Sequence, residues 1–242
     1  IVEAKTSNTS LYDRLDLGTN AKKIQLNEHV LFIGKAAGGG AQRYFMRTGA
    51  DQQVYVVDPM PQISWALKDW AGLKIPNLDK SCVRNVSIRH ADGSYIKIVT
   101  AAIGSNFTLA DLGQNEEPVY DQVGDALAGA FNYLTYDAIA PVSELSFEKA
   151  IQTRFETWDG LRVTAFIVER DNAHWVRFEA NRAPLSDQAS PQMPTATVDL
   201  DRELETFSEL TKWAFQIPDH KLTEFVKRRG DFLKRDQELG VE

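Results

Sequence analysis

A pattern that occurs three times along the chain constrains its fold more than any other feature. Each time, extended segments precede an amphipathic helical run and an exit that passes from an aromatic residue to a proline. The clearest exits are Trp70–Pro76 and Trp213–Pro218, and a looser one runs from Phe131 to Pro141. We expect Trp70 and Trp213 to be largely buried at equivalent positions. The repetition assigns most large apolar residues to packing, so the sequence predicts architecture and identifies neither a reaction nor a ligand.

The extended segments predict antiparallel strands, because apolar and polar residues alternate along them. Asp92-Gly93 and Asp159-Gly160 are typical of tight hairpin turns. Hairpins followed by helices indicate an α+β fold rather than a parallel α/β fold. We expect tandem antiparallel hairpin or meander units, each with a helix, packed as one repeat-like assembly in which helices cover the sheet. The predicted divisions are a tether over 1–20, units over 21–81, 82–147 and 148–242, and a long loop over 181–198.

Charge and cysteine content limit the class of partner. The 242 residues carry a formal net charge of −7 at pH 7, which argues against nucleic acid or an anionic membrane surface as the main partner. The single cysteine, Cys82, fits a reducing compartment, and equally a periplasmic protein that folds without disulfides. No apolar run reaches the roughly 18 residues of a membrane span. The chain opens with Ile1-Val2 rather than Met, so we expect a processed or cut chain that has lost an upstream signal or anchor.

The glycine-rich segment Gly34–Gly40 is similar to a phosphate-binding loop but has the wrong spacing. A P-loop needs a glycine five residues before the Gly-Lys pair and a Ser or Thr after it, whereas Ala36 follows Lys35. The next expected element is a strand, so no helix N-terminus would face an anion. A flexible hairpin is therefore favoured over an anion site.

The histidines and the cysteine match no metal-binding or catalytic motif. The four histidines are His29, His90, His174 and His220, and no two have the i, i+4 spacing of a metal-binding helix. His90 and His174 lie beside hairpin turns, where exposure is expected. Cys82 is interpreted as a buried structural thiol at the start of a strand. We therefore predict no catalytic, cofactor-binding or metal-binding residue, and no cofactor.

Two charged clusters and two indoles have structural interpretations. Glu116-Glu117 is expected to complement a helix dipole rather than to perform acid–base chemistry. Lys227–Arg229 and Lys234-Arg235 are expected to complement the C-terminal end of the last helix. Trp158 and Trp175 are expected to pack across neighbouring strands rather than to mark a binding face.

The run Phe155–Val163, continued by His174–Phe178, resembles the bacterial domain-of-unknown-function 4340 family, whose members carry a similar "fDGl-v" hairpin and "wvrl" strand. Trp213–Pro218, Leu11–Leu15 and Ile33–Lys35 are also similar to that family. The resemblance spans most of the chain. These motifs are structural, so the resemblance supplies no catalytic residue. It implies an N-terminal membrane helix outside the given chain and an extracytoplasmic accessory domain, often encoded beside ABC-type transport components related to gliding-motility systems.

Two functional hypotheses remain open. The first is a non-enzymatic extracytoplasmic binding or scaffolding domain of a membrane-tethered, transporter-associated assembly on the periplasmic side of the inner membrane. Its partner would be a protein or an envelope polymer and not nucleic acid, with membrane contact only through the missing N-terminal anchor. The alternative is a hydrolase whose carboxylates or histidines lie far apart in the sequence. A deep pocket of converging Asp, Glu or His side chains, at least one with a strongly shifted pKa, would favour the hydrolase.

Overall fold

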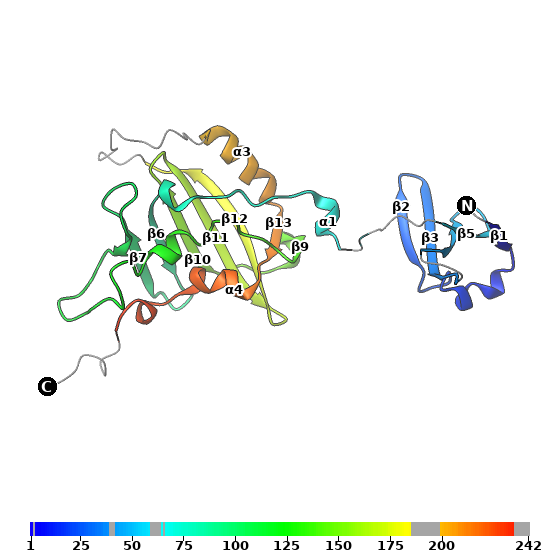
Figure 1. Ribbon diagram of the computed structural model, residues 1–242, viewed down its shortest axis with the longest axis horizontal. Helices are drawn as coiled ribbons and strands as arrows, with labels where there is room; N and C mark the ends of the chain where they lie inside the picture. Colours follow the sequence, from blue (N-terminus) through cyan, green and yellow to red (C-terminus); the bar gives the residue numbers. More distant parts are fainter. Residues whose placement is uncertain (2, 39–41, 59–63, 65, 185–198, 235–242) are drawn as a thin grey trace. The chain divides into compact units, whose positions relative to one another are not determined.

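The computed structural model describes residues 1, 3–38, 42–58, 64, 66–184 and 199–234. The chain divides into two units, residues 1–64 and 65–242, and each has its own antiparallel sheet (Figure 1). The predicted α+β class is confirmed by these two sheets and the short helices that accompany them.

The first unit is a five-stranded sheet in the order β1-β5-β4-β3-β2. Its strands are β1 (Glu3–Thr6), β2 (Lys22–Leu26), β3 (His29–Ala36), β4 (Tyr44–Thr48) and β5 (Val54–Val57). Two 3₁₀ helices, η1 (Thr9–Leu11) and η2 (Asp13–Leu15), precede the fully buried Leu17. Residues 1–20, expected to be a tether, instead supply an edge strand and a core side chain.

The glycine-rich segment joins β3 to β4, which pair antiparallel as the predicted hairpin requires. Residues 39–41 of that segment lie outside the described residues. Gly34 itself lies in β3, where a Cβ atom would come within 2.1 Å of the carbonyl oxygen of Leu15. This glycine therefore permits close packing of β3 against the chain that follows η2.

We expect Gly34→Ala to destabilise the first unit by about 1–3 kcal/mol, because the added methyl group must displace backbone. All five tryptophans lie after residue 64, so unfolding of this unit is best followed through the NMR amide signals of β3 during a urea titration. Lys35→Ala, at the exposed next residue, is the control and should change stability by less than about 0.5 kcal/mol. Equal midpoints for the two variants would contradict the tight contact with Leu15.

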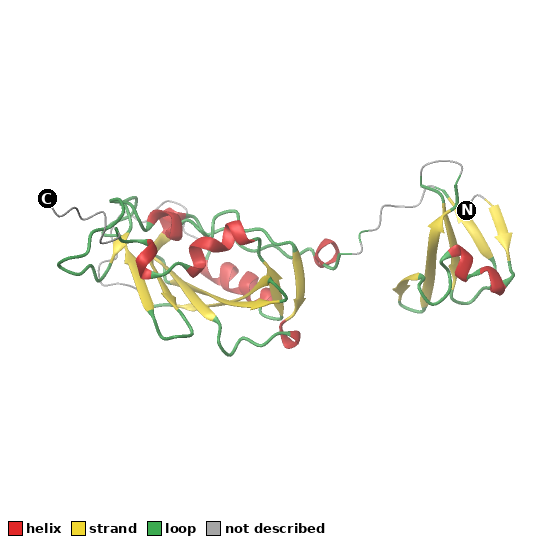
Figure 2. Cartoon of the chain, turned by 90° about the horizontal axis from the view of Figure 1, so that it is seen from below, coloured by secondary structure: helices red, strands yellow, loops and turns green. Residues whose placement is uncertain are grey.

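The second unit is built on an eight-stranded sheet in the order β8-β7-β6-β10-β11-β12-β13-β9. Its strands are β6 (Val83–Arg89), β7 (Tyr95–Val99), β8 (Thr108–Leu109), β9 (Ala138–Pro141), β10 (Ile151–Thr157), β11 (Leu161–Arg170), β12 (Ala173–Arg182) and β13 (Trp213–Gln216). Its helices are α1 (Lys68–Ala71), α2 (Asp125–Ala128), α3 (Leu200–Leu210) and α4 (Asp219–Leu222), with 3₁₀ turns η3 (Lys80–Cys82), η4 (Val142–Glu144), η5 (Thr223–Val226) and η6 (Arg229–Asp231). Figure 2 shows these helices and strands in a second view.

The element order β6-β7-β8-α2-β9 recurs as β10-β11-β12-α3-β13. The expected units over 82–147 and 148–242 thus share an order of elements, and both contribute strands to one sheet. Superposition of the units stays a prediction. The predicted equivalence of Trp70 and Trp213 is wrong, because Trp70 lies in α1 with 62% of its surface exposed. Trp213 is half-buried and begins β13.

The predicted hairpin turns are confirmed in this sheet. Asp92-Gly93 joins β6 to β7, and Asp159-Gly160 joins β10 to β11. Asp171 and Asn172 join β11 to β12 with φ values of 53° and 58°, as the two central residues of a type I′ turn require. The loop expected over 181–198 begins after β12, which ends at Arg182, and its residues 185–198 lie outside the described residues.

One face of the eight-stranded sheet packs against the helices. Phe207 of α3 and Phe225 of η5 are almost fully buried against sheet residues such as Phe155. Phe131 lies at the centre, with its ring centroid 5.3 Å from that of Phe155 and 5.4 Å from that of Phe178. Because side chains alternate along a strand, the intervening residues form the opposite face of the sheet, called here the outer face.

Candidate functional site

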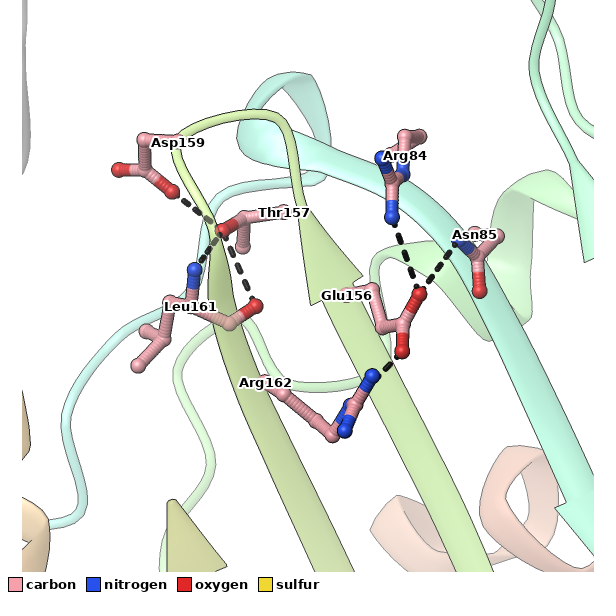
Figure 3. Close-up of polar contacts among 7 residues, drawn as sticks. All are labelled: Arg84, Asn85, Glu156, Thr157, Asp159, Leu161 and Arg162. Atoms are coloured by element: carbon pink, nitrogen blue, oxygen red, sulfur yellow. Dashed lines mark hydrogen bonds and ion pairs between the residues drawn. The ribbon is translucent and has the colours of Figure 1, made fainter. Parts of the chain in front are cut away.

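The candidate site lies on the outer face, where four polar side chains meet. Glu156 on β10 stands opposite Asn85 on β6 and Arg162 on β11. Next to this row, the β6–β10 register shifts, so that Thr157 pairs with Val83 and leaves Arg84 as an extra residue. Such a bulge re-aims a side chain, and Figure 3 shows Arg84, Asn85 and Arg162 converging on Glu156. These four residues are called the Glu156 cluster.

Both carboxylate oxygens of Glu156 are engaged. Its Oε2 accepts hydrogen bonds from Arg84 Nη2 and Asn85 Nδ2, each at 3.1 Å. Its Oε1 accepts one from Arg162 Nε at 2.8 Å. Burial raises the pKa of Glu156, but the hydrogen bonds from Asn85, Arg162 and Arg84 outweigh burial, so the pKa is lowered. Glu156 is therefore ionised at neutral pH and compensates two arginines, which is a structural role rather than that of a proton donor.

A hollow of about 260 Å³ lies beside the Glu156 cluster. Besides Arg84, Asn85 and Glu156, its lining comprises Lys97, Val99, Thr100, Ala101 and Trp158. The Trp158 Nε1 atom is buried and has no hydrogen-bond partner in the described part of the chain. The hollow thus presents Arg84 and Lys97 beside the Trp158 side chain, and such cations suit the binding of an acceptor-rich or anionic group.

The neighbouring turn holds its own polar groups in place (Figure 3). Thr157, 2% exposed, donates its hydroxyl hydrogen to Asp159 and accepts a hydrogen bond from the Leu161 backbone amide at 2.9 Å. Asp159 therefore stabilises the β10–β11 turn, and this turn positions Trp158 beside the hollow.

A protein-family model matches more than half of the chain. The model of the family described as Domain of unknown function (DUF4340) matches residues 2–154. The chain belongs to the DUF4340 family. The match contains the front motifs Leu11–Leu15 and Ile33–Lys35, and it ends one residue before the hairpin motif that begins at Phe155. No curated protein and no solved structure matches the chain.

Two residues of the basic cluster, Arg229 and Lys234, pair with Glu116-Glu117, whereas Lys227 pairs with Glu224 and Arg228 with Asp92. Arg235 lies outside the described residues. Arg229 Nε donates to Glu116 Oε1 at 2.9 Å, and Lys234 Nζ lies 2.9 Å from Glu117 Oε2. The predicted dipole roles are wrong, because Glu116-Glu117 precedes no helix and Arg229 begins the 3₁₀ turn η6. Hydrogen bonds from Arg229 and from the Gly113 amide lower the pKa of Glu116 to about 2.

Glu116 should contribute to the acid sensitivity of the fold. Its folded-state pKa lies below the unfolded value of about 4.3, so its stabilisation is present above that value and is lost as the pH falls towards about 2. We expect Glu116→Gln to be less stable than wild type at pH 7, with a difference that shrinks as the pH falls from 5 to about 3. Urea unfolding at a series of pH values measures this. Glu205→Gln, at an exposed position of α3, is the control, and a pH-independent difference for Glu116→Gln would contradict the assignment.

The histidines depart from the sequence expectation at two positions. His90, expected to be exposed, is 4% exposed, and its Nε2 lies 3.1 Å from the Lys227 carbonyl oxygen. His174 is half-buried, with its Nδ1 2.9 Å from Asp219 Oδ1. His29 and His220 are exposed. Across the described ranges, no three His, Cys, Asp or Glu side chains are grouped so as to hold a metal ion.

Cys82 is half-buried rather than buried, at the end of η3. Burial raises the pKa of its thiol, so Cys82 is a poor nucleophile. Trp175 is half-buried on the outer face, with Val168 and Gln216 on the flanking strands, which matches the predicted cross-strand position. In the described part of the chain, no helix is long and apolar enough to cross a membrane.

Sequence reasoning singled out no member of the Glu156 cluster. Arg84 and Glu156 lie 72 positions apart, and only strand register brings them together. The available signal was the presence of polar or charged residues at alternate positions of β6 (Asn85, Ser87, Arg89) and β10 (Gln152, Arg154, Glu156), which indicates a solvent-facing side of a half-covered sheet.

Proposed function

We propose that this DUF4340 chain is a non-enzymatic extracytoplasmic binding or scaffolding domain of a membrane-tethered, transporter-associated assembly. The observation that carries the proposal is the outer face of the eight-stranded sheet, where Glu156 is held between arginines beside an open hollow. Arginine and aromatic side chains on an accessible face are typical of protein interfaces. The placement on the periplasmic side, the tether to the inner membrane and the transporter association rest on the family resemblance alone.

The hydrolase alternative has weaker support. Burial raises the pKa of Glu203 on α3, and the negative charges of Asp159 and Asp199 raise it further. The nearby Arg202 lowers this pKa, but the net shift is upward. The carboxylate that lines the hollow, Glu156, instead has a lowered pKa and no free oxygen. A general acid needs a raised pKa at the place where the substrate binds, so binding accounts better for this hollow.

Site-specific photo-crosslinking in a strain that carries the full-length protein tests the proposal. A crosslinking residue at Tyr95, which is 44% exposed on the outer face, should capture components of the cell envelope. The same residue at Glu205, on an exposed side of α3, is the matched control and should capture much less. Capture of cytosolic metabolic proteins alone would overturn the extracytoplasmic binding role.

A further inference from the structure

Three positively charged side chains surround Ser87 on the outer face. Ser87 on β6 stands opposite Lys97 on β7 and Arg154 on β10, and Arg89 follows two positions later on β6. Neighbouring strands lie about 4.8 Å apart, and alternate residues of a strand lie about 6.8 Å apart. The three cationic residues therefore start from a triangle with sides of about 8–10 Å. Together with Tyr95 they are called the Ser87 patch.

The charges of the Ser87 patch are not compensated within the described residues. Elsewhere on the outer face, Glu156 pairs with Arg84 and Arg162, and Glu179 pairs with Arg177. No carboxylate of the described chain forms an ion pair with Arg89, Lys97 or Arg154.

This local excess stands out because the whole chain carries a net charge of −7. Arg89 lies diagonally across from Lys97 on β7 and from Arg154 on β10, so each of these pairs places two like charges on neighbouring strands about 8 Å apart. Within the described residues, the fold gains a contact between Arg89 and the Tyr95 ring from this arrangement but no ion pair, and a bound negative partner would relieve the repulsion.

The surroundings of the patch favour a protein partner. Tyr95 is 44% exposed, and its ring centroid lies 5.3 Å from Arg89 Cζ. Tyrosine and arginine, together with tryptophan, are enriched at the energetic centres of protein interfaces. Arg89 and Arg154 stand outside the hollow that Lys97 lines, and a small anion needs a concave site to displace its water.

We propose that the Ser87 patch docks an acidic segment of a partner protein. An extended anionic membrane would be repelled by the net negative charge of the whole chain. A short acidic segment on the patch meets only the charges within a Debye length of about 8 Å. The proposal rests on the binding function proposed above and adds the chemistry of the partner: carboxylates that pair with Arg89, Lys97 and Arg154, next to an apolar or aromatic side chain on Tyr95.

A charge-reversal variant tests the docking site. In the patch variant, Arg89→Glu, Lys97→Glu and Arg154→Glu are combined. The matched control combines Lys74→Glu, Arg202→Glu and Lys212→Glu, three exposed cations elsewhere in the second unit, and it changes the net charge equally. The probe is a fluorescently labelled peptide of ten glutamates, followed by anisotropy at an ionic strength of about 0.15 M, where the Debye length is about 8 Å. We expect wild type to bind it and added salt to weaken the binding.

The patch variant should bind this peptide about tenfold more weakly or worse, and the control should change by less than about threefold. A second patch variant with glutamine at all three positions should also lose binding, which separates lost contacts from new repulsion. Circular dichroism establishes that each variant is folded. Equal loss in patch and control variants, or no binding by wild type, would overturn the proposal.

Two further experiments distinguish the proposed docking site from the alternative explanations. Vesicles rich in phosphatidylglycerol should compete poorly with the peptide. If the vesicles bind at least as strongly as the peptide and this binding depends on the patch, the partner is a membrane rather than a protein. In the crosslinking strain, capture from Tyr95 should be lost in the patch variant. Unchanged capture would contradict the docking site but not the proposed binding function. If the wild-type protein captured only cytosolic proteins, the proposed binding function itself would be contradicted.

Discussion

Phe131→Ala is expected to lower the free energy of unfolding of the second unit by about 3–5 kcal/mol, as for other truncations of large aromatic core residues. Phe131 is fully buried, and its ring lies 5.3 Å from Phe155, 5.4 Å from Phe178, 6.1 Å from Phe207 and 6.0 Å from Phe225, measured between centroids. The substitution removes contacts with strand, helix and 3₁₀ turn at once. The surrounding rings are held by separate elements and cannot collapse together into the space.

Urea unfolding followed by tryptophan fluorescence measures this effect, because every tryptophan lies in the second unit. Tyr133→Ala is the matched control, since Tyr133 is two residues further along and 75% exposed. It should shift the unfolding free energy by less than about 0.5 kcal/mol. A loss below about 1 kcal/mol for Phe131→Ala would show that the core repacks around the missing ring.

The strands were predictable because their signals are local. Alternation and Asp-Gly pairs depend on residues within a few positions, and the hairpins β6–β7 and β10–β11 form at the two predicted Asp-Gly turns. The helices were less predictable, because apolar spacing reports burial and not hydrogen bonding. The amphipathic helical run expected before the exit from Phe131 to Pro141 yields only the four-residue α2. Gly124, the residue before α2, packs so closely on Phe107 that a Cβ atom there would come within 2.8 Å of the Phe107 Cβ atom.

The candidate site was not predictable because its contacts are long-range. The charges of Glu116 and Arg229 are evident in the sequence, but the two residues lie 113 positions apart. Their pairing was therefore missed, and each was wrongly assigned to a helix dipole. In the Glu156 cluster, a single extra residue in β6 decides which side chains face the carboxylate. A bulge of this kind leaves no composition signal, so register has to be observed.

Glu156→Ala is expected to lower the free energy of unfolding by about 2–4 kcal/mol. Breaking a buried ion pair by removing one partner costs about 3–5 kcal/mol, because the remaining charge is left without compensation. Here two arginines lose their shared carboxylate. The range is set lower because the side chains of Arg84 and Arg162 are 18% and 26% exposed and can turn towards water. Urea unfolding at pH 7, followed by tryptophan fluorescence, measures the difference.

Glu179→Ala provides the matched control on the same face. Glu179 pairs with Arg177, but its side chain is 44% exposed, and exposed pairs contribute about 0–1 kcal/mol. Glu156→Gln should lie between the two, because the amide oxygen still accepts one hydrogen bond while the amide nitrogen faces an arginine. If Glu156→Ala costs no more than Glu179→Ala, solvent already compensates the arginines. The Glu156 cluster would then be an exposed part of the outer face rather than a rigid support for the proposed binding surface.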